Sequence, residues 1–178
     1  MTVKELSETA SLSGTALELV REESTPSSYL EDLEKKELYQ DAIRFLAFKL
    51  PTDAGIKWAS SCLKELRNPQ DKDKKDEPLD AADQWVKAPG DPTRWAAKEA
   101  SDKTSKNGPS NLLAMAVFMS GGSLSPPGAP MTPPPKYAAQ KLIAGTVLVV
   151  VVSFELQKAA ERYKRALKLG KALDSPGA

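Results

Sequence analysis

The 178-residue chain contains no histidine and one cysteine, and aromatic residues make up only 6% of it. The missing histidine excludes Ser–His and Cys–His nucleophile pairs, histidine metal ligands and the usual acid–base group near neutral pH. The single Cys62 excludes an intramolecular disulfide and a thiolate zinc site, and it fits a reducing compartment. Any catalysis would have to rely on carboxylates, lysine or tyrosine.

The chain also lacks an excess of charge of either sign. It has 25 basic and 24 acidic residues, a net charge of +1. Such a balance gives no electrostatic attraction to nucleic acid or to an anionic membrane, so we expect neither as a partner. The length is that of one domain, which can bury a core without disulfides or metals. We assign no catalytic residue, no metal site and no cofactor.

The longest apolar run covers residues 142–152. Lys141 and Glu155 bracket only thirteen uncharged residues, whereas a membrane-spanning helix needs about 20 apolar residues. The valines in this run favour a strand, but no second strand candidate exists to pair with it, so we predict a buried core helix. Residues 1–20 show no basic segment followed by an apolar run, and we expect no secretory signal there.

Residues 120–135, here called the proline strap, lie between two apolar segments. Six of the fourteen prolines fall within residues 126–135. Proline fixes φ and removes the amide donor, which predicts an extended, polyproline-type connection. The strap is either a structural connection or a recognition surface. Tryptophans grip extended prolines, and no basic residue flanks the strap as in external polyproline ligands, so we expect the strap to pack on the tryptophans of its own domain.

Apolar side chains recur at three- and four-residue spacing from residue 38 to residue 66. This spacing predicts two helices that a turn at Pro51 joins into an antiparallel hairpin. A second hairpin is predicted from Asp80 onward, with its turn at Pro89. Because the two turns lie 38 residues apart and each is followed by Trp-Ala, a duplicated hairpin of the α-solenoid type is indicated.

Two glycines follow apolar helical segments and predict where those helices end. Gly121 follows the apolar segment 112–119, where it would supply a left-handed cap. Gly170 follows the last amphipathic segment, which carries Lys and Arg toward its end. We expect one helix to stop at each glycine.

The sequence as a whole predicts an all-α, α-solenoid-like domain. Residues 25–172 would form six to seven helices in antiparallel hairpins, with the proline strap before the last two. Residues 1–24 would be a loosely ordered arm with one short ordered element, because their apolar pattern is weak. Residues 68–78 would be a charged linker, and residues 173–178 a disordered tail.

Several runs resemble a family of small uncharacterised bacterial proteins. The most specific run is Ser120-Gly-Gly-Ser-Leu-Ser-Pro-Pro-Gly128, with three further prolines after it. The others are Asp41–Pro51, Trp58-Ala59 with Cys62, Ala82–Val86 and Ala160–Tyr163. The resemblance covers residues 38–170, and members often carry paired tryptophans where this chain has Lys57-Trp58. The family, a domain of unknown function associated with secretion-related gene clusters, implies an intracellular bacterial helical protein and supplies no activity.

The sequence therefore favours a non-catalytic interaction or adaptor module of a bacterial cytoplasm, with a protein as its partner. The partner-binding residues we assign are Trp85, Trp95, Leu124, Pro126, Pro127, Pro130 and Pro133. Two further hypotheses stay open. One is a peripheral membrane or secretion-apparatus component that uses residues 142–152, and the other is an enzyme that works without histidine.

Overall fold

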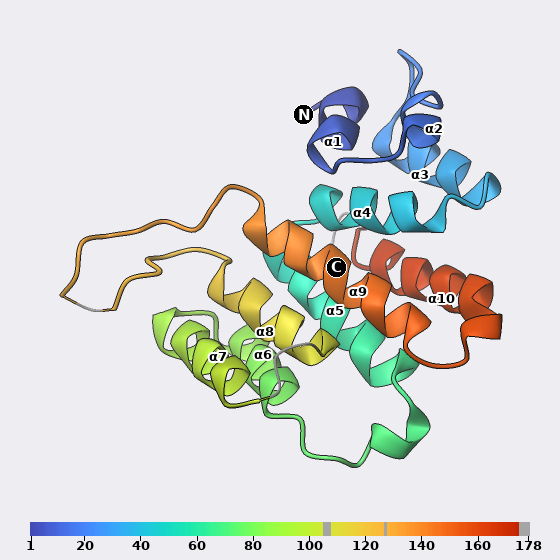
Figure 1. The fold of residues 1–178 in the computed structure, drawn as a ribbon. Helices are drawn as coiled ribbons and strands as arrows, with labels where there is room; N and C mark the ends of the chain where they lie inside the picture. The colour runs from blue at the N-terminus through green and yellow to red at the C-terminus, as the bar shows by residue number, and fades with distance from the viewer. Residues whose placement is uncertain (105–107, 127, 175–178) are drawn as a thin grey trace.

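The computed structural model describes residues 1–104, 108–126 and 128–174. Within these ranges the chain forms ten α-helices, nine of them of seven residues or more, and no strand (Figure 1). The helices are α1 (Val3–Thr9), α2 (Gly14–Leu17), α3 (Pro26–Lys35), α4 (Tyr39–Lys49), α5 (Thr52–Leu66), α6 (Glu77–Lys87), α7 (Asp91–Lys103), α8 (Pro109–Phe118), α9 (Ala138–Val152) and α10 (Ala159–Lys171). The all-α prediction is confirmed, and the helices are more numerous than predicted.

Two of the additional helices lie in residues 1–24, where the sequence predicted a loosely ordered arm. A capping box starts α1, because the Thr2 hydroxyl accepts from the Glu5 amide while the Glu5 carboxylate accepts from the Thr2 amide. At the start of α2, the amide and hydroxyl of Ser13 donate to Asp41 of α4 at 2.9 and 2.8 Å. Leu6 is buried in the shared core. Both helices are too short to show a clear period in the sequence.

Helices α4 and α5 do not form the predicted antiparallel hairpin. The residues between them, Leu50 and Pro51, are both extended, with ψ angles of 145° and 147°. Two extended residues change the direction of the chain without bringing it back alongside itself. Each helix packs instead against α9 and α10. The second hairpin is present, since α6 and α7 pack on each other.

Helix α9 is the centre of the fold. It packs against α8, α5, α4 and α10, so helices far apart in the sequence share one core (Figure 1). In a solenoid each repeat contacts only its sequence neighbours, and this arrangement differs from it. The prediction of a buried helix over residues 142–152 is confirmed for one side of α9, where Ile143, Val147, Val150 and Val151 are fully buried.

No single helix in the described ranges is long and apolar enough to cross a membrane. Helix α9 and the segment Leu156–Lys171 reach that length and composition only together, and the chain bends by 114° between them.

Trp58 and Gly170 form a tight contact between α5 and α10. Trp58 is fully buried, and its indole N–H donates to the carbonyl of Ala166 at 2.8 Å. A Cβ on Gly170 would lie 2.6 Å from a methyl of Leu46 and 2.8 Å from the Trp58 ring. Helix α10 continues through Gly170 to Lys171. The glycine therefore permits close packing of α10. The prediction that the helix ends at Gly170 is wrong.

The remaining connections are more ordered than their composition indicates. Within the charged segment 68–78, a short 3₁₀-helix covers Pro69–Asp71 and α6 already begins at Glu77. At the C-terminal end, Leu173 packs against the core and Asp174 pairs with Lys49. Residues 175–178 of the predicted tail lie outside the described ranges.

Candidate functional site

The proline strap begins at the end of α8, beside α7. Trp95 of α7 meets Phe118, the last residue of α8, edge-to-face with ring centroids 5.0 Å apart. The guanidinium of Arg94 lies 5.0 Å from the Phe118 ring and 5.5 Å from the Trp95 ring. Such contacts between a cation and aromatic faces stabilise a desolvated arginine. The rings of Trp95 and Phe118 therefore pack against the buried guanidinium of Arg94, at the point where the strap begins.

Arg94 binds the backbone on both sides of the point where the strap leaves α8. Its side chain is only 4% exposed. One terminal N–H donates to the Phe118 carbonyl at 2.9 Å, the other donates to the Ser123 carbonyl at 2.8 Å, and Nε donates to Asp91 at 2.9 Å. Charge-assisted bonds of this kind are stronger than neutral ones. Arg94 thus closes the C-terminus of α8 and fixes the start of the strap.

The Gly-Gly pair of the strap fits this arrangement through its second member. Gly122 has φ +66°, and a Cβ there would lie 2.8 Å from Nη2 of Arg94 and 2.9 Å from Asp91. Only glycine combines this left-handed backbone with so close an approach. Gly121 faces open space. The prediction that Gly121 ends α8 is wrong, because α8 already ends at Phe118 and the left-handed residue is Gly122.

Hydrogen bonds then close the strap into a loop. The hydroxyl oxygen of Ser123 accepts from the amides of Ser125 and Thr132, each at 3.1 Å. The Leu124 amide donates to the Thr132 carbonyl at 2.7 Å, and the Ser125 and Thr132 hydroxyls lie 2.8 Å apart. Residues 123–125 and residue 132 are therefore held side by side. They form the base of the loop.

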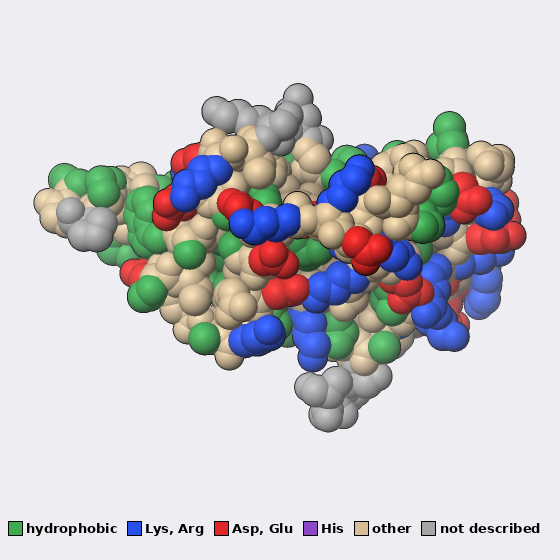
Figure 2. All heavy atoms as spheres, turned by 90° about the horizontal axis from the view of Figure 1, so that it is seen from below, with side chains coloured by type: hydrophobic (Ala, Val, Ile, Leu, Met, Phe, Trp, Pro, Cys, Tyr) green, Lys and Arg blue, Asp and Glu red, His purple; other side chains and the backbone are tan. Residues whose placement is uncertain are grey.

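Beyond this base the strap projects from the helical body. We call Pro126 and residues 128–131 the strap tip; Pro127 lies outside the described ranges. All of these tip residues are exposed, and the Met131 side chain is 75% exposed. A turn shapes the tip, in which the Ala129 amide donates to the Pro126 carbonyl at 3.1 Å. Apolar atoms gather on the projection at the left of Figure 2, which is the strap.

The structure brings together only some of the residues assigned from the sequence. Leu124, Pro126, Pro130 and Pro133 lie on the strap, Leu124 half-buried at its base and the three prolines exposed. Trp95 supports the base of the strap through Phe118. The expectation that the tryptophans hold the whole strap is wrong for the tip, because the tip is exposed to solvent.

Trp85 lies in a different pocket of about 240 Å³. The pocket is lined by residues of α5, among them Lys57, and by residues of α6, the α6–α7 turn and the C-terminal end. Trp58, next to Lys57 in the chain, is fully buried in the core. The neighbouring residues Lys57 and Trp58 therefore have different surroundings, one a surface pocket and the other the core.

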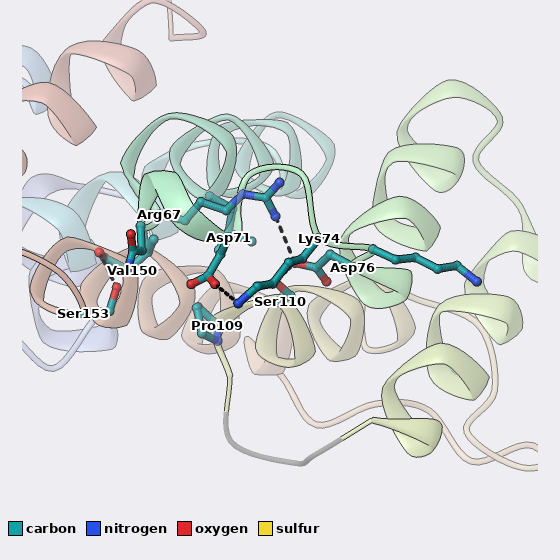
Figure 3. A pocket seen from close by; sticks show the side chains of 11 residues that line it. Arg67, Asp71, Lys74, Asp76, Pro109, Ser110, Val150 and Ser153 are labelled. Atoms are coloured by element: carbon teal, nitrogen blue, oxygen red, sulfur yellow. Dashed lines mark hydrogen bonds and ion pairs between the residues drawn. The ribbon is translucent and has the colours of Figure 1, made fainter.

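A pocket of about 360 Å³ between α5, α8, the end of α9 and the charged segment is lined by many polar side chains (Figure 3). Asp76 caps α6 through the Leu79 amide, accepts from the Ser110 hydroxyl at 2.6 Å and lies 3.4 Å from Arg67. Figure 3 shows Arg67 and Ser110 converging on this carboxylate from different elements. Asp71 pairs with Lys74 at 2.7 Å. The contacts of Asp76 tie the charged segment to α8 and to the end of α5, which is a structural use of its charge.

Sequence reasoning missed three residues of the strap base, Arg94, Ser123 and Thr132. Arg94 is 29 residues from the carbonyl it binds, and no local pattern marks such a contact. The Gly-Gly pair was a usable signal, since adjacent glycines often mark a close approach of the backbone to another group.

Comparison with curated proteins and with solved structures gives no significant match. The sequence model of a family of unknown function (DUF6931) matches residues 29–174. The match begins within α3, includes the whole strap and all later helices, and leaves α1 and α2 outside it. It confirms the resemblance seen in the sequence. The chain belongs to the family of unknown function DUF6931.

Proposed function

We propose that the protein is a non-catalytic interaction module of a bacterial cytoplasm, which captures a partner protein through the strap tip. One observation carries the proposal. The strap is fixed at its base by Arg94 and Ser123, while the tip beyond that base stands exposed and apolar. A loop held in this way is suited to being presented to another molecule.

The fixed base favours binding because it lowers the entropy lost on association. A free loop of this length would lose backbone and side-chain freedom when it docks, at about 0.5–1.5 kcal/mol for each immobilised side chain. Prolines already restrict φ along the tip, and the Ser123–Thr132 bonds fix where the tip begins. Both effects are present before any partner binds.

The exposure of the tip is difficult to explain by folding alone. Burying an apolar side chain stabilises a fold by about 1.5–3 kcal/mol, and Met131, 75% exposed, contributes little of this. A flexible thioether such as that of Met131 adapts to irregular apolar surfaces. Proline rings pack against aromatic side chains in the grooves that bind proline-rich segments. The partner we propose is a protein with such a groove.

The experiment replaces Pro126, Pro130 and Met131 together by serine and leaves the base residues intact. We expect the triple variant to keep its far-UV circular dichroism and its thermal midpoint, because these side chains are exposed. Tagged protein is then used as bait in the native host. Proteins that the unaltered chain retains above background should be lost from the triple variant.

The matched control is Leu17→Ser on α2, which also replaces an exposed apolar side chain by serine. It should retain the same proteins as the unaltered chain. Equal retention by the triple variant and by the unaltered chain would show that the strap tip is not the docking surface. A triple variant that unfolds would show that the strap is structural, which is equally against the proposal.

A further inference from the structure

Helix α9 is apolar on every side, yet one of its faces is exposed. In the described ranges the large exposed apolar side chains are few, and Val149 (36% exposed) and Val152 (41% exposed) are among them. Gly145 and Leu148 lie on the same face, half-buried, at helical spacing. An all-round apolar helix is normally buried on all sides. In this chain α8, α5, α4 and α10 cover the other sides, and this face stays open.

The open face is hollowed near its N-terminal half and raised near its C-terminal half. Ala144, Gly145 and Leu148 border a pocket of about 410 Å³, which Phe48 of α4 and residues 10–11 also line. The C-terminal half of the face carries the branched side chains of Val149 and Val152. Small residues therefore occupy one half of the helix and projecting residues the other half.

Residues of opposite charge lie near the two ends of α9 in the chain. Lys141 is exposed near the start of α9, and Glu155, a third exposed, lies three residues beyond its end. Leu148 lies seven residues from each of them. If a second α9 runs antiparallel with Leu148 at the centre, Lys141 of each copy lies next to the C-terminal end of the other helix, where Glu155 follows. The same register sets Ala144 opposite Val152.

We propose that this face pairs with the same face of a second copy of the chain, with the two α9 helices antiparallel about a two-fold axis at Leu148. A two-fold interface uses one patch twice, so the patch must be complementary to itself. The hollow half meets the raised half, and the basic end meets the acidic end. Glu155 already pairs with Lys158 of its own chain at 2.7 Å, and the second cation adds to that pair.

This arrangement also places the two straps. The strap leads into the start of α9, and the two starts lie at opposite ends of an antiparallel pair. Each dimer would carry one strap at either end.

The first experiment detects the two-fold centre with a cysteine at Leu148. The native Cys62 is fully buried, which raises the pKa of its thiol far above the usual range and keeps it from reacting. Leu148→Cys under mild oxidation should therefore give one disulfide-linked species with twice the mass of a single chain. Gln84→Cys, at an exposed position of α6, is the control and should stay single.

The second experiment exchanges the charges, with association measured by sedimentation equilibrium. Lys141→Glu alone and Glu155→Lys alone each create two like-charge pairs in the dimer and should weaken association about tenfold. The double variant restores both pairs and should recover the original dissociation constant. Lys87→Glu on α6 is the matched control and should change nothing.

A chain that sediments as a single copy at every accessible concentration overturns the proposal, as does a dimer that tolerates both single charge changes. Cross-linking through Gln84→Cys but not Leu148→Cys also overturns it, because the copies would then meet elsewhere. Should Leu148→Cys fail to fold, Val149→Cys is used instead, since that side chain is more exposed.

Discussion

The C-termini of α8 and α9 both have backbone carbonyls without a donor from their own helix, and in both an arginine of another helix supplies it. Both helices are strongly apolar, and neither has a basic residue in its last turn. Their final carbonyls thus lack a cation of their own, which would complement the helix dipole. In each case an arginine from another helix donates to them. Arg94 of α7 binds the end of α8, and Arg162 of α10 binds the end of α9.

The two arginines differ in what else they hold. Arg162 donates to Val151 at 2.6 Å and to Val150 at 2.8 Å, and it also reaches the Leu66 carbonyl at the end of α5. It therefore joins three helices. Burial lowers the pKa of Arg162, which reflects how far its guanidinium is withdrawn from water. Arg94 joins one helix end to the strap. Arg162 thus connects helices of the core, whereas Arg94 connects the core to the strap.

Arg162→Ala should have the largest effect, because it leaves carbonyls of two helix ends without their donor. We expect the free energy of unfolding to fall by about 3 kcal/mol, measured by urea denaturation. Arg162→Lys keeps the charge but cannot donate in the same fork, and it should lose about half as much. A loss below about 0.5 kcal/mol for Arg162→Ala would contradict the role of this residue as a junction of three helices.

Arg94→Ala should have a smaller effect on stability and a local effect on the strap. We expect a loss of about 2 kcal/mol, since two carbonyl contacts and the aromatic contacts disappear. The amides of Leu124 and Thr132 should exchange with deuterium much faster, while amides of α9 and α10 stay protected. Uniform loss of protection over the whole chain would mean that Arg94 serves the core as Arg162 does, and the comparison would fail.

Gly122→Ala and Gly121→Ala test the same junction from the side of the strap. Gly122→Ala imposes a side chain on a left-handed residue against Arg94, and it should destabilise the protein by about 1.5 kcal/mol. Gly121→Ala meets open space and should change stability by no more than about 0.5 kcal/mol. Thermal unfolding of the two variants in parallel gives the answer. Equal losses of stability in the two variants would show that Arg94 does not pack closely against the backbone at Gly122.

Local patterns predicted much of the secondary structure and little of the packing. The helix over residues 142–152 was predictable because its length, its lack of charge and the absence of a partner strand are all visible in the sequence. The hairpin predicted at Pro51 is wrong, because the extended backbone of Leu50 and Pro51 does not bring α5 back alongside α4. Helices α1 and α2 also escaped prediction, because contacts with α4 rather than their own period order them.

In the candidate site, too, the local structure was predictable and the packing was not. Composition predicted that Pro126, Pro130 and Pro133 share one connection without helix or strand, and they do, but the connection folds back at a turn instead of staying extended. What holds that connection comes from Arg94 on another helix and from Thr132 across the loop. Those contacts arise from folding, so composition alone could not show that the base would be fixed and the tip left free.

The two arginine junctions also set how the protein responds to acid. An arginine guanidinium keeps its proton far beyond neutral pH, even where burial lowers its pKa. The chain has no histidine, so no side chain with an ordinary pKa changes charge between about pH 5 and 8. The ends of α8 and α9 thus keep their donors throughout that range. A change of pH within that range would leave the guanidinium donors at both helix ends protonated.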